Sequence, residues 1–159
     1  MFLENFISPT EIEFLIDVIL AVVLGFIIGA ERELRGKDAG ISTHTFVILG
    51  AMLFTFMSSN VDPNSQSRIA AQIVSGIGFL GAGIILKDGT TVKNLTTAAS
   101  IWFAGSIGMA IGFGYYFIAI VAGITSVIIP RIPHVRSLTS LNHNSSQKLN
   151  TKKDEPTDM

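Results

Sequence analysis

The chain has 159 residues, of which 48% are hydrophobic and only 14% are charged, and its mean hydropathy is +0.53. Soluble domains carry about 25% charged residues, so this composition favours a membrane protein. The absence of cysteine excludes disulfides and thiolate metal sites, and a net charge of −1 provides no basic face for nucleic acid.

Five apolar segments are long enough, or nearly so, to cross a bilayer, which takes about 20 mostly apolar residues. We expect the first to be a retained span rather than a cleaved signal peptide, because the first basic residue, Arg32, follows the apolar run instead of preceding it. We therefore predict an all-α integral membrane protein, with a five-helix bundle in residues 1–133 and a disordered polar tail in 134–159. The predicted spans cover about residues 12–30, 41–58, 69–87, 95–112 and 113–131.

The distribution of lysine and arginine predicts the orientation of the bundle. Counting only those near the span ends, seven of these residues lie in 31–40, in 87–94 and in 131–136, whereas the N-terminus and the 59–68 loop together hold only Arg68. Basic loops stay in the cytoplasm. The N-terminus is therefore expected outside and the C-terminus inside.

The first span contains an acidic residue, Asp17, on the same helix face as Ala21, Gly25 and Gly29. A charge at membrane depth costs about 2.5–3.5 kcal/mol on insertion scales, so such a residue usually faces a cavity or a partner. Three interpretations stay open: an interfacial aspartate reached by water, a proton or cation site, and a structural hydrogen bond.

Charged residues gather at the cytoplasmic end of the first span, where Glu31 and Arg35 have the spacing of a helical ion pair and Gly36 suits a helix C-cap. Further polar residues follow at the start of the second span and in the loop before the fourth. These residues are predicted to form either a structural network or a cytoplasmic interaction surface. The candidates are Glu31, Arg32, Glu33, Arg35, Lys37, Asp38, His44, Asp88, Lys93 and Asn94.

Small residues recur at helical spacing in every long span, which predicts close helix crossings. Thr96 and Thr97, at the start of the fourth span, can either cap that helix or hydrogen-bond across helices. Trp102 lies in the middle of that span, which suggests a packed or pore-lining position. The predicted packing residues are Gly25, Gly29, Gly76, Gly78, Gly81, Gly83, Trp102, Ala104, Gly108 and Gly112.

No constellation of residues predicts catalysis, because the spans contain no nucleophile elbow and no metal-hydrolase motif. We expect neither enzymatic activity nor a cofactor. The carboxylates of 31–38 and Asp88 are oxygen ligands of the kind that Mg²⁺ or Ca²⁺ takes, but their pattern does not define a metal site.

Several motifs in this order resemble the MgtC/SapB family over about residues 12–130. They are GAERE at 29–33, RGKDAG at 35–40 with Thr43 and His44, GIGFLGAG at 76–83, and LTTAASIW at 95–102 followed by Gly108. The resemblance implies a bacterial inner-membrane protein with five spans. Founding members of the family are virulence proteins needed at low magnesium, thought to modulate other membrane machines; older descriptions call the family Mg²⁺ transporters.

The sequence departs from those founding members in two respects. They carry a soluble C-terminal domain with an ACT-like fold, where this chain has a polar tail of about 26 residues, and some have a cysteine where this chain has Phe103.

Two functions are expected from the residues and the resemblance together. The first is a regulator that binds another membrane protein complex in the lipid bilayer, during adaptation to low magnesium or a related stress. The second is a small cation transporter or channel, for Mg²⁺ or H⁺, in which Asp17 is the coupling group. A homo-oligomer is compatible with either.

Overall fold

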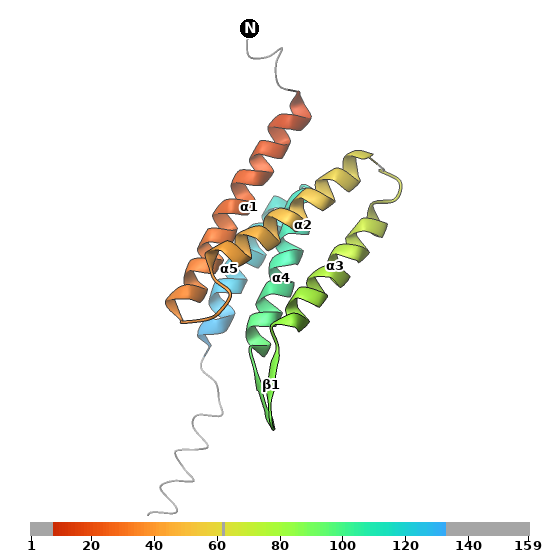
Figure 1. Ribbon diagram of the computed structural model, residues 1–159. Helices are drawn as coiled ribbons and strands as arrows, with labels where there is room; N and C mark the ends of the chain where they lie inside the picture. The colour runs from red at the N-terminus through yellow and green to blue at the C-terminus, as the bar shows by residue number, and fades with distance from the viewer. Residues whose placement is uncertain (1–7, 62, 133–159) are drawn as a thin grey trace, which may run out of the picture. The chain divides into compact units, whose positions relative to one another are not determined.

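The computed structural model describes residues 8–61 and 63–132 (Figure 1). The chain divides into a unit of residues 1–129, which holds the described α-helices, and a second unit of residues 130–159. The predicted tail at 134–159 lies outside the described residues. The elements are α1 (Pro9–Leu34), α2 (Ile41–Val61), α3 (Gln66–Gly83), β1 (Leu86–Asp88), β2 (Thr91–Lys93), α4 (Leu95–Gly112), α5 (Tyr116–Ile128) and the short 3₁₀ helix η1 (Ile129–Arg131).

Both ends of α1 are fixed by local hydrogen bonds. At its start, the Ser8 side chain accepts from the amide of Glu11, whose carboxylate accepts from the Ser8 amide in return, which is a capping box. At its end, Gly36 adopts a φ of +63°, and the amides of Gly36 and Lys37 donate to the carbonyls of Glu33 and Arg32. This is a Schellman motif, so the C-cap predicted at Gly36 is confirmed.

Helix α2 packs closely against both α1 and α4, with glycine at each contact. A Cβ added at Gly29 would meet the backbone of Ile41 on α2. On the other side, a Cβ added at Gly108 of α4 would meet the backbone carbonyl of Ile48. The small side chains predicted to allow close crossings thus do so at both faces of α2.

A buried apolar layer joins α1, α2, α4 and α5 in the middle of the bundle. Helix α3 contributes less, packing Ile73 and Ile77 against Ala51 of α2 and Ile101 of α4. The main cluster consists of Ala21, Leu24, Ile28, Ile48, Met52, Ala104, Ile107, Ile111 and Ala119.

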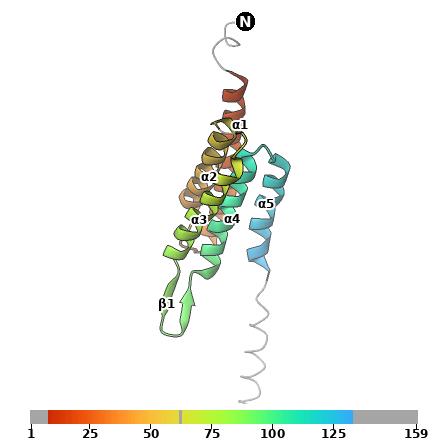
Figure 2. The ribbon, with the colours of Figure 1, turned by 90° about the vertical axis from the view of Figure 1, so that its right-hand side faces the viewer.

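The third and fifth helices differ from the predicted segments 69–87 and 113–131. Helix α3 ends at Gly83, and residues 86–93 form an antiparallel hairpin, β1 with β2, that extends beyond the ends of α3 and α4 (Figure 2). Helix α5 begins at Tyr116, because Gly114, with a φ of +76°, ends α4 in a second Schellman motif. Alternation over so few residues gives a weak strand signal, and the hairpin was therefore missed.

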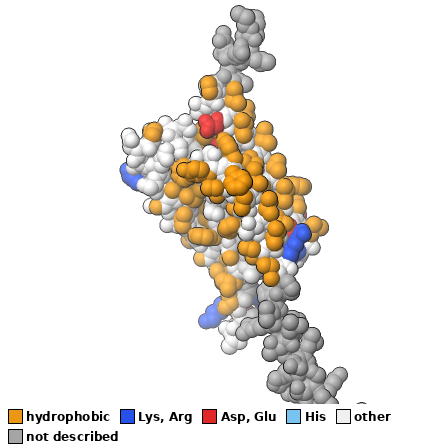
Figure 3. Space-filling model, turned by 180° about the vertical axis from the view of Figure 1, so that it is seen from behind, with side chains coloured by type: hydrophobic (Ala, Val, Ile, Leu, Met, Phe, Trp, Pro, Cys, Tyr) orange, Lys and Arg blue, Asp and Glu red, His pale blue; other side chains and the backbone are white. Residues whose placement is uncertain are grey.

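Among the described residues, three helices are long and apolar enough to cross a membrane: α1, α2 and α4. Helix α5 is apolar but too short to meet this criterion of length and hydropathy. Helix α3 is long enough, but Gln66, Arg68 and Gln72 make it too polar. The predicted all-α fold of five helices is confirmed, and three of the five predicted spans are supported by length and composition. Hydrophobic side chains cover much of the exposed surface, as one face shows (Figure 3).

Candidate functional site

Charged side chains are buried at two separate places in the bundle; Thr55 and Ser58 are buried apart from them, on α2. The first place, here called the Arg32 cluster, contains Glu31, Arg32, His44, Thr97 and Ser100 and lies where α1 ends and α2 and α4 begin. The second, called the Asp17 site, lies in the first half of α1 and faces Tyr116 at the start of α5.

Arg32 joins α1 to α4. Its side chain is only 2% exposed, and Nη2 donates a hydrogen bond of 2.8 Å to Oγ1 of Thr97, which is itself buried. The neighbouring Glu31 is also buried and accepts a hydrogen bond of 3.3 Å from Nη1 of Arg35. The ion pair predicted between Glu31 and Arg35 is confirmed, and Thr97 makes the contact across helices that the sequence suggested.

His44 joins α2 to α4 in the same cluster. It is fully buried, and its Nδ1 lies 3.0 Å from the carbonyl oxygen of Gly40. Because a carbonyl only accepts, Nδ1 carries the proton. Nε2 lies 3.3 Å from Oγ of Ser100, whose hydroxyl donates to the carbonyl of Thr97 at 2.8 Å. The histidine therefore fixes the position of α2 on α4, with both ring nitrogens facing oxygen atoms.

The turn between α1 and α2 is closed by Glu33. Its Oε1 accepts a hydrogen bond of 2.9 Å from the amide of Ile41, the first residue of α2, and thereby caps that helix. A Cβ added at Gly40 would collide with the Glu33 side chain. Only glycine leaves room for this cap.

The Asp17 site is buried as the small-residue face predicted, with Asp17 1% exposed. The carboxylate has a side-chain hydrogen-bond interaction with Tyr116, but no described residue bonds to its Oδ1. Sequence reasoning missed Tyr116, since a tyrosine near a span end is equally typical of an interfacial anchor.

The structure separates the residues predicted to form either a structural network or a cytoplasmic interaction surface. Glu31, Arg32 and His44 are inside the bundle, whereas Lys37 and Asp38 are exposed on the α1–α2 turn. Glu33 and Arg35 lie at the end of α1. The other three candidates lie on and beside the hairpin, where Lys93 and Asp88 form an exposed ion pair of 3.3 Å and Asn94 donates to the carbonyl of Ile84 at 3.3 Å.

Asn94 also occupies the left-handed region, with a φ of 64°, at the N-cap of α4. The left-handed backbone conformation accounts for an asparagine at this position, because asparagine tolerates it better than most residues do.

The predicted packing residues fall into two groups. Gly25, Gly29, Gly108 and Gly112 contact α2 at backbone distance, and Ala104 is fully buried. Gly81 lies opposite the Ala98 carbonyl. In contrast, a Cβ at Gly76, Gly78 or Gly83 of α3 would have no described atom within 4 Å. Trp102 is half exposed and lines a small cavity of about 160 Å³ between α3 and α4.

Within residues 8–61 and 63–132, no three histidine, cysteine, aspartate or glutamate side chains come close enough together to hold a metal ion. The acidic residues that suggested oxygen ligands are dispersed: Glu31 pairs with Arg35, Glu33 caps α2 and Asp88 pairs with Lys93. The described residues thus offer hydrogen-bonded helix contacts and two buried carboxylates, Asp17 and Glu31, on opposite halves of α1.

These features define a multi-pass α-helical membrane protein. Residues 18–135 match the MgtC family, and the chain belongs to that family. It is 45% identical over 111 residues to protein MgtC of Salmonella typhimurium strain LT2, a match covering 70% of this chain and 48% of that protein. It is 39% identical over 144 residues to the Escherichia coli K12 protein named "Putative magnesium transporter YhiD", covering 83% and 66%.

An uncharacterized protein of Synechocystis is 44% identical over 133 residues, covering 82% of this chain and 56% of that protein. The chain thus spans about half to two thirds of the length of these curated relatives. No solved structure matches it.

Proposed function

We propose that this protein is a five-span bacterial inner-membrane protein, with its N-terminus outside, that regulates other membrane machinery during adaptation to low magnesium or a related stress. Membership of the MgtC family supports the proposal, as does the name of the Escherichia coli relative, which refers to magnesium. In this role the chain carries out no reaction and acts by binding.

The observation that favours a regulator is the apolar layer between the two buried polar places. Asp17 and Arg32 lie on the same helix, but Ala21, Leu24 and Ile28 lie buried between them. The layer continues through Ile48 and Met52 of α2 and Ile107 and Ile111 of α4. A cation crossing one copy of the bundle would need polar groups in this layer, since an ion in an apolar interior is costly.

Regulation by binding requires an accessible surface, and the bundle provides one. Large apolar side chains are exposed along its helices, such as Phe79 on α3 and Phe117 on α5, each about 80% exposed. Membrane helices associate by packing rather than by the hydrophobic effect, so the small residues exposed on α3 favour contact with a partner helix. Lys37 and Asp38 add charge at the expected cytoplasmic end.

Photo-crosslinking in native membranes tests this proposal. A photoreactive amino acid at Phe79 or Phe117 is expected to capture a defined membrane protein, identified by mass spectrometry. The same amino acid at Ile48, which is fully buried, is the matched control and should capture nothing outside the chain. If the exposed positions recover no partner above the level of Ile48, the regulatory proposal fails.

The alternative is a cation transporter or channel, and the unpaired Oδ1 of buried Asp17 is what supports it, within the described residues. Mg²⁺ and proton uptake into proteoliposomes, with an ionophore control, distinguishes the two proposals. Uptake by the wild type that is lost in Asp17→Asn would establish transport and its site. If correctly inserted protein took up neither Mg²⁺ nor protons, the transport proposal would fail and the regulatory proposal would be favoured.

A further inference from the structure

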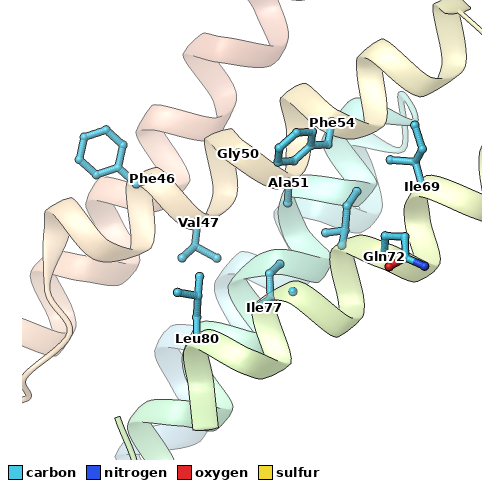
Figure 4. Close-up of a pocket in the computed structure, with 11 residues that line it drawn as sticks. Phe46, Val47, Gly50, Ala51, Phe54, Ile69, Gln72, Ile77 and Leu80 are labelled. Atoms are coloured by element: carbon cyan, nitrogen blue, oxygen red, sulfur yellow. The ribbon is translucent and has the colours of Figure 1, made fainter. Parts of the chain in front are cut away.

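A groove runs between α2 and α3 on the surface of the bundle. Its apolar part has a volume of about 500 Å³ (Figure 4). Val47 of α2 and Leu80 of α3 point toward one another across it, and Phe54 stands at its border. Gly50 and Gly76 line it without filling it, since a Cβ at either would have no described atom within 4 Å. The groove is therefore an open space bounded almost entirely by hydrocarbon.

The groove continues into a polar cavity of about 520 Å³ at the end of the bundle where α2 leads into α3. The two spaces share Ile69 and Gln72 in their linings. The polar cavity is otherwise lined by Ser58, Ser65 and Arg68, together with Ala71. Polarity thus changes from one end of a single depression to the other.

Three features at the polar end favour an anion. Arg68 is exposed and brings a positive charge. The cavity also includes Ser65 at the N-terminus of α3, where the helix dipole is positive and where, among the described residues, the serine side chain makes no capping bond. Independently, Ser58 is only 3% exposed, and its Oγ has no hydrogen-bond partner in the described part of the chain.

Leaving a buried hydroxyl without a partner costs more than a hydrogen bond usually contributes. Among the described residues Thr45, Ser58 and Ser59 have such hydroxyls, and Ser58 is the one of the three that lines this cavity. Its position in the lining of the cavity indicates a ligand that accepts or donates there. Arg68 is also the only basic residue assigned to that side of the membrane by the charge distribution. The basic residues of the other loops favour the predicted orientation, with those loops in the cytoplasm. Arg68 disfavours that orientation, so its presence needs another explanation.

We propose that the α2–α3 groove binds an anionic phospholipid, with one acyl chain against Val47, Ile77 and Leu80 and the phosphate at Arg68 and Ser58. An amphiphile matches a depression that is apolar along its length and basic at one end. A packed helix of a partner protein would place apolar side chains against Arg68 and would leave its charge without a counterion. The guanidinium forms paired hydrogen bonds with phosphate oxygens.

The test uses the detergent-purified chain, titrated with dioleoylphosphatidylglycerol or dioleoylphosphatidylethanolamine and observed by native mass spectrometry. One phosphatidylglycerol per protomer is expected to bind, with at least about tenfold preference over the zwitterionic lipid. Arg68→Gln should weaken phosphatidylglycerol binding about tenfold, as expected for one charge-assisted contact. Gly76→Leu should fill the groove and weaken phosphatidylglycerol binding by at least the same factor.

Two variants serve as matched controls. Lys93→Gln removes the same charge at the hairpin, and Gly83→Leu adds the same side chain to α3 outside the groove. Both should bind like the wild type. Because Arg68 and Gly76 are exposed, their variants should keep the wild-type thermal midpoint, which separates loss of binding from loss of folding.

Other results would overturn the proposal. Equal binding of the two lipids would remove the role of Arg68. If glycerol 3-phosphate displaced phosphatidylglycerol and Gly76→Leu had no effect on binding, the cavity would bind an anion but the groove would not bind an acyl chain. A dimer in the mass spectrum that Gly76→Leu dissociates would show that a second copy occupies the groove.

Discussion

Arg32 and Thr97 are 65 positions apart in the chain, yet Nη2 of Arg32 donates a 2.8 Å hydrogen bond to Oγ1 of Thr97, and each residue is 2% exposed. A guanidinium is costly to bury unless its donors are paired. The contact therefore fixes where α4 begins relative to the end of α1, and it makes both residues sensitive to substitution.

Thr97→Val removes the hydroxyl while conserving the shape of the side chain. We expect it to lower the free energy of unfolding by about 1.5–3 kcal/mol, because it takes an acceptor from a buried charged group. Denaturation in mixed detergent micelles measures the change. Thr96→Val is the control, since Thr96 is exposed and its replacement should alter stability little. Equal effects of the two substitutions would contradict the assigned role of Thr97.

Gly108→Ala tests the close contact between α4 and α2. The added methyl group would meet the carbonyl of Ile48, a backbone atom that cannot move aside cheaply. A loss of about 1–3 kcal/mol in unfolding free energy is expected from this overpacking. Gly78→Ala makes the same chemical change on α3 where no described atom lies within 4 Å, and should be tolerated. The thermal midpoints of the two variants provide the comparison.

Glu33→Ala is expected to loosen the start of α2 without unfolding the bundle. It removes the acceptor of the Ile41 amide, and the loss of such a helix cap costs about 0.5–2 kcal/mol. Hydrogen–deuterium exchange should accelerate at residues 41–44 and stay unchanged in α4. Lys37→Ala, in the same turn, is the control. Unchanged exchange at residues 41–44 would show that the cap contributes nothing.

The predicted orientation can be checked by cysteine labelling, because the natural chain contains no cysteine. A membrane-impermeant maleimide added to intact cells should label Asn64→Cys in the α2–α3 loop. It should label Lys37→Cys in the α1–α2 turn only after the membrane is permeabilised. Both positions are exposed in the fold, so access depends on the membrane alone. The reverse pattern would place the N-terminus in the cytoplasm.

Much of the helical arrangement was readable from the sequence because membrane helices are long, apolar and bounded by charge. The segment predicted at 95–112 coincides with α4, and the turn after α1 was indicated by Gly36. The hairpin at 86–93 was missed, because strands of three residues are too short for alternation to show. The late start of α5 depends on the backbone conformation at Gly114, which composition alone does not specify.

The candidate site was predictable only in part. The i, i+4 spacing of Glu31 and Arg35 directly implied their ion pair, and the small-residue face of α1 implied that Asp17 points inward. Nothing local in the sequence linked His44 to Ser100, which are 56 positions apart, or Asp17 to Tyr116. Such contacts depend on which helices become neighbours.

The sequence by itself determined the class of protein, the main helices and the family, because hydropathy, small-residue spacing and ordered motifs are local properties of the chain. The tertiary structure decided which charged residues are buried and which glycines contact another helix. It also decided that Arg68 and Ser58 share a cavity with an apolar groove. The physical reason is that burial and contact depend on the crossing of α2 with its neighbours, and no single helix carries that information.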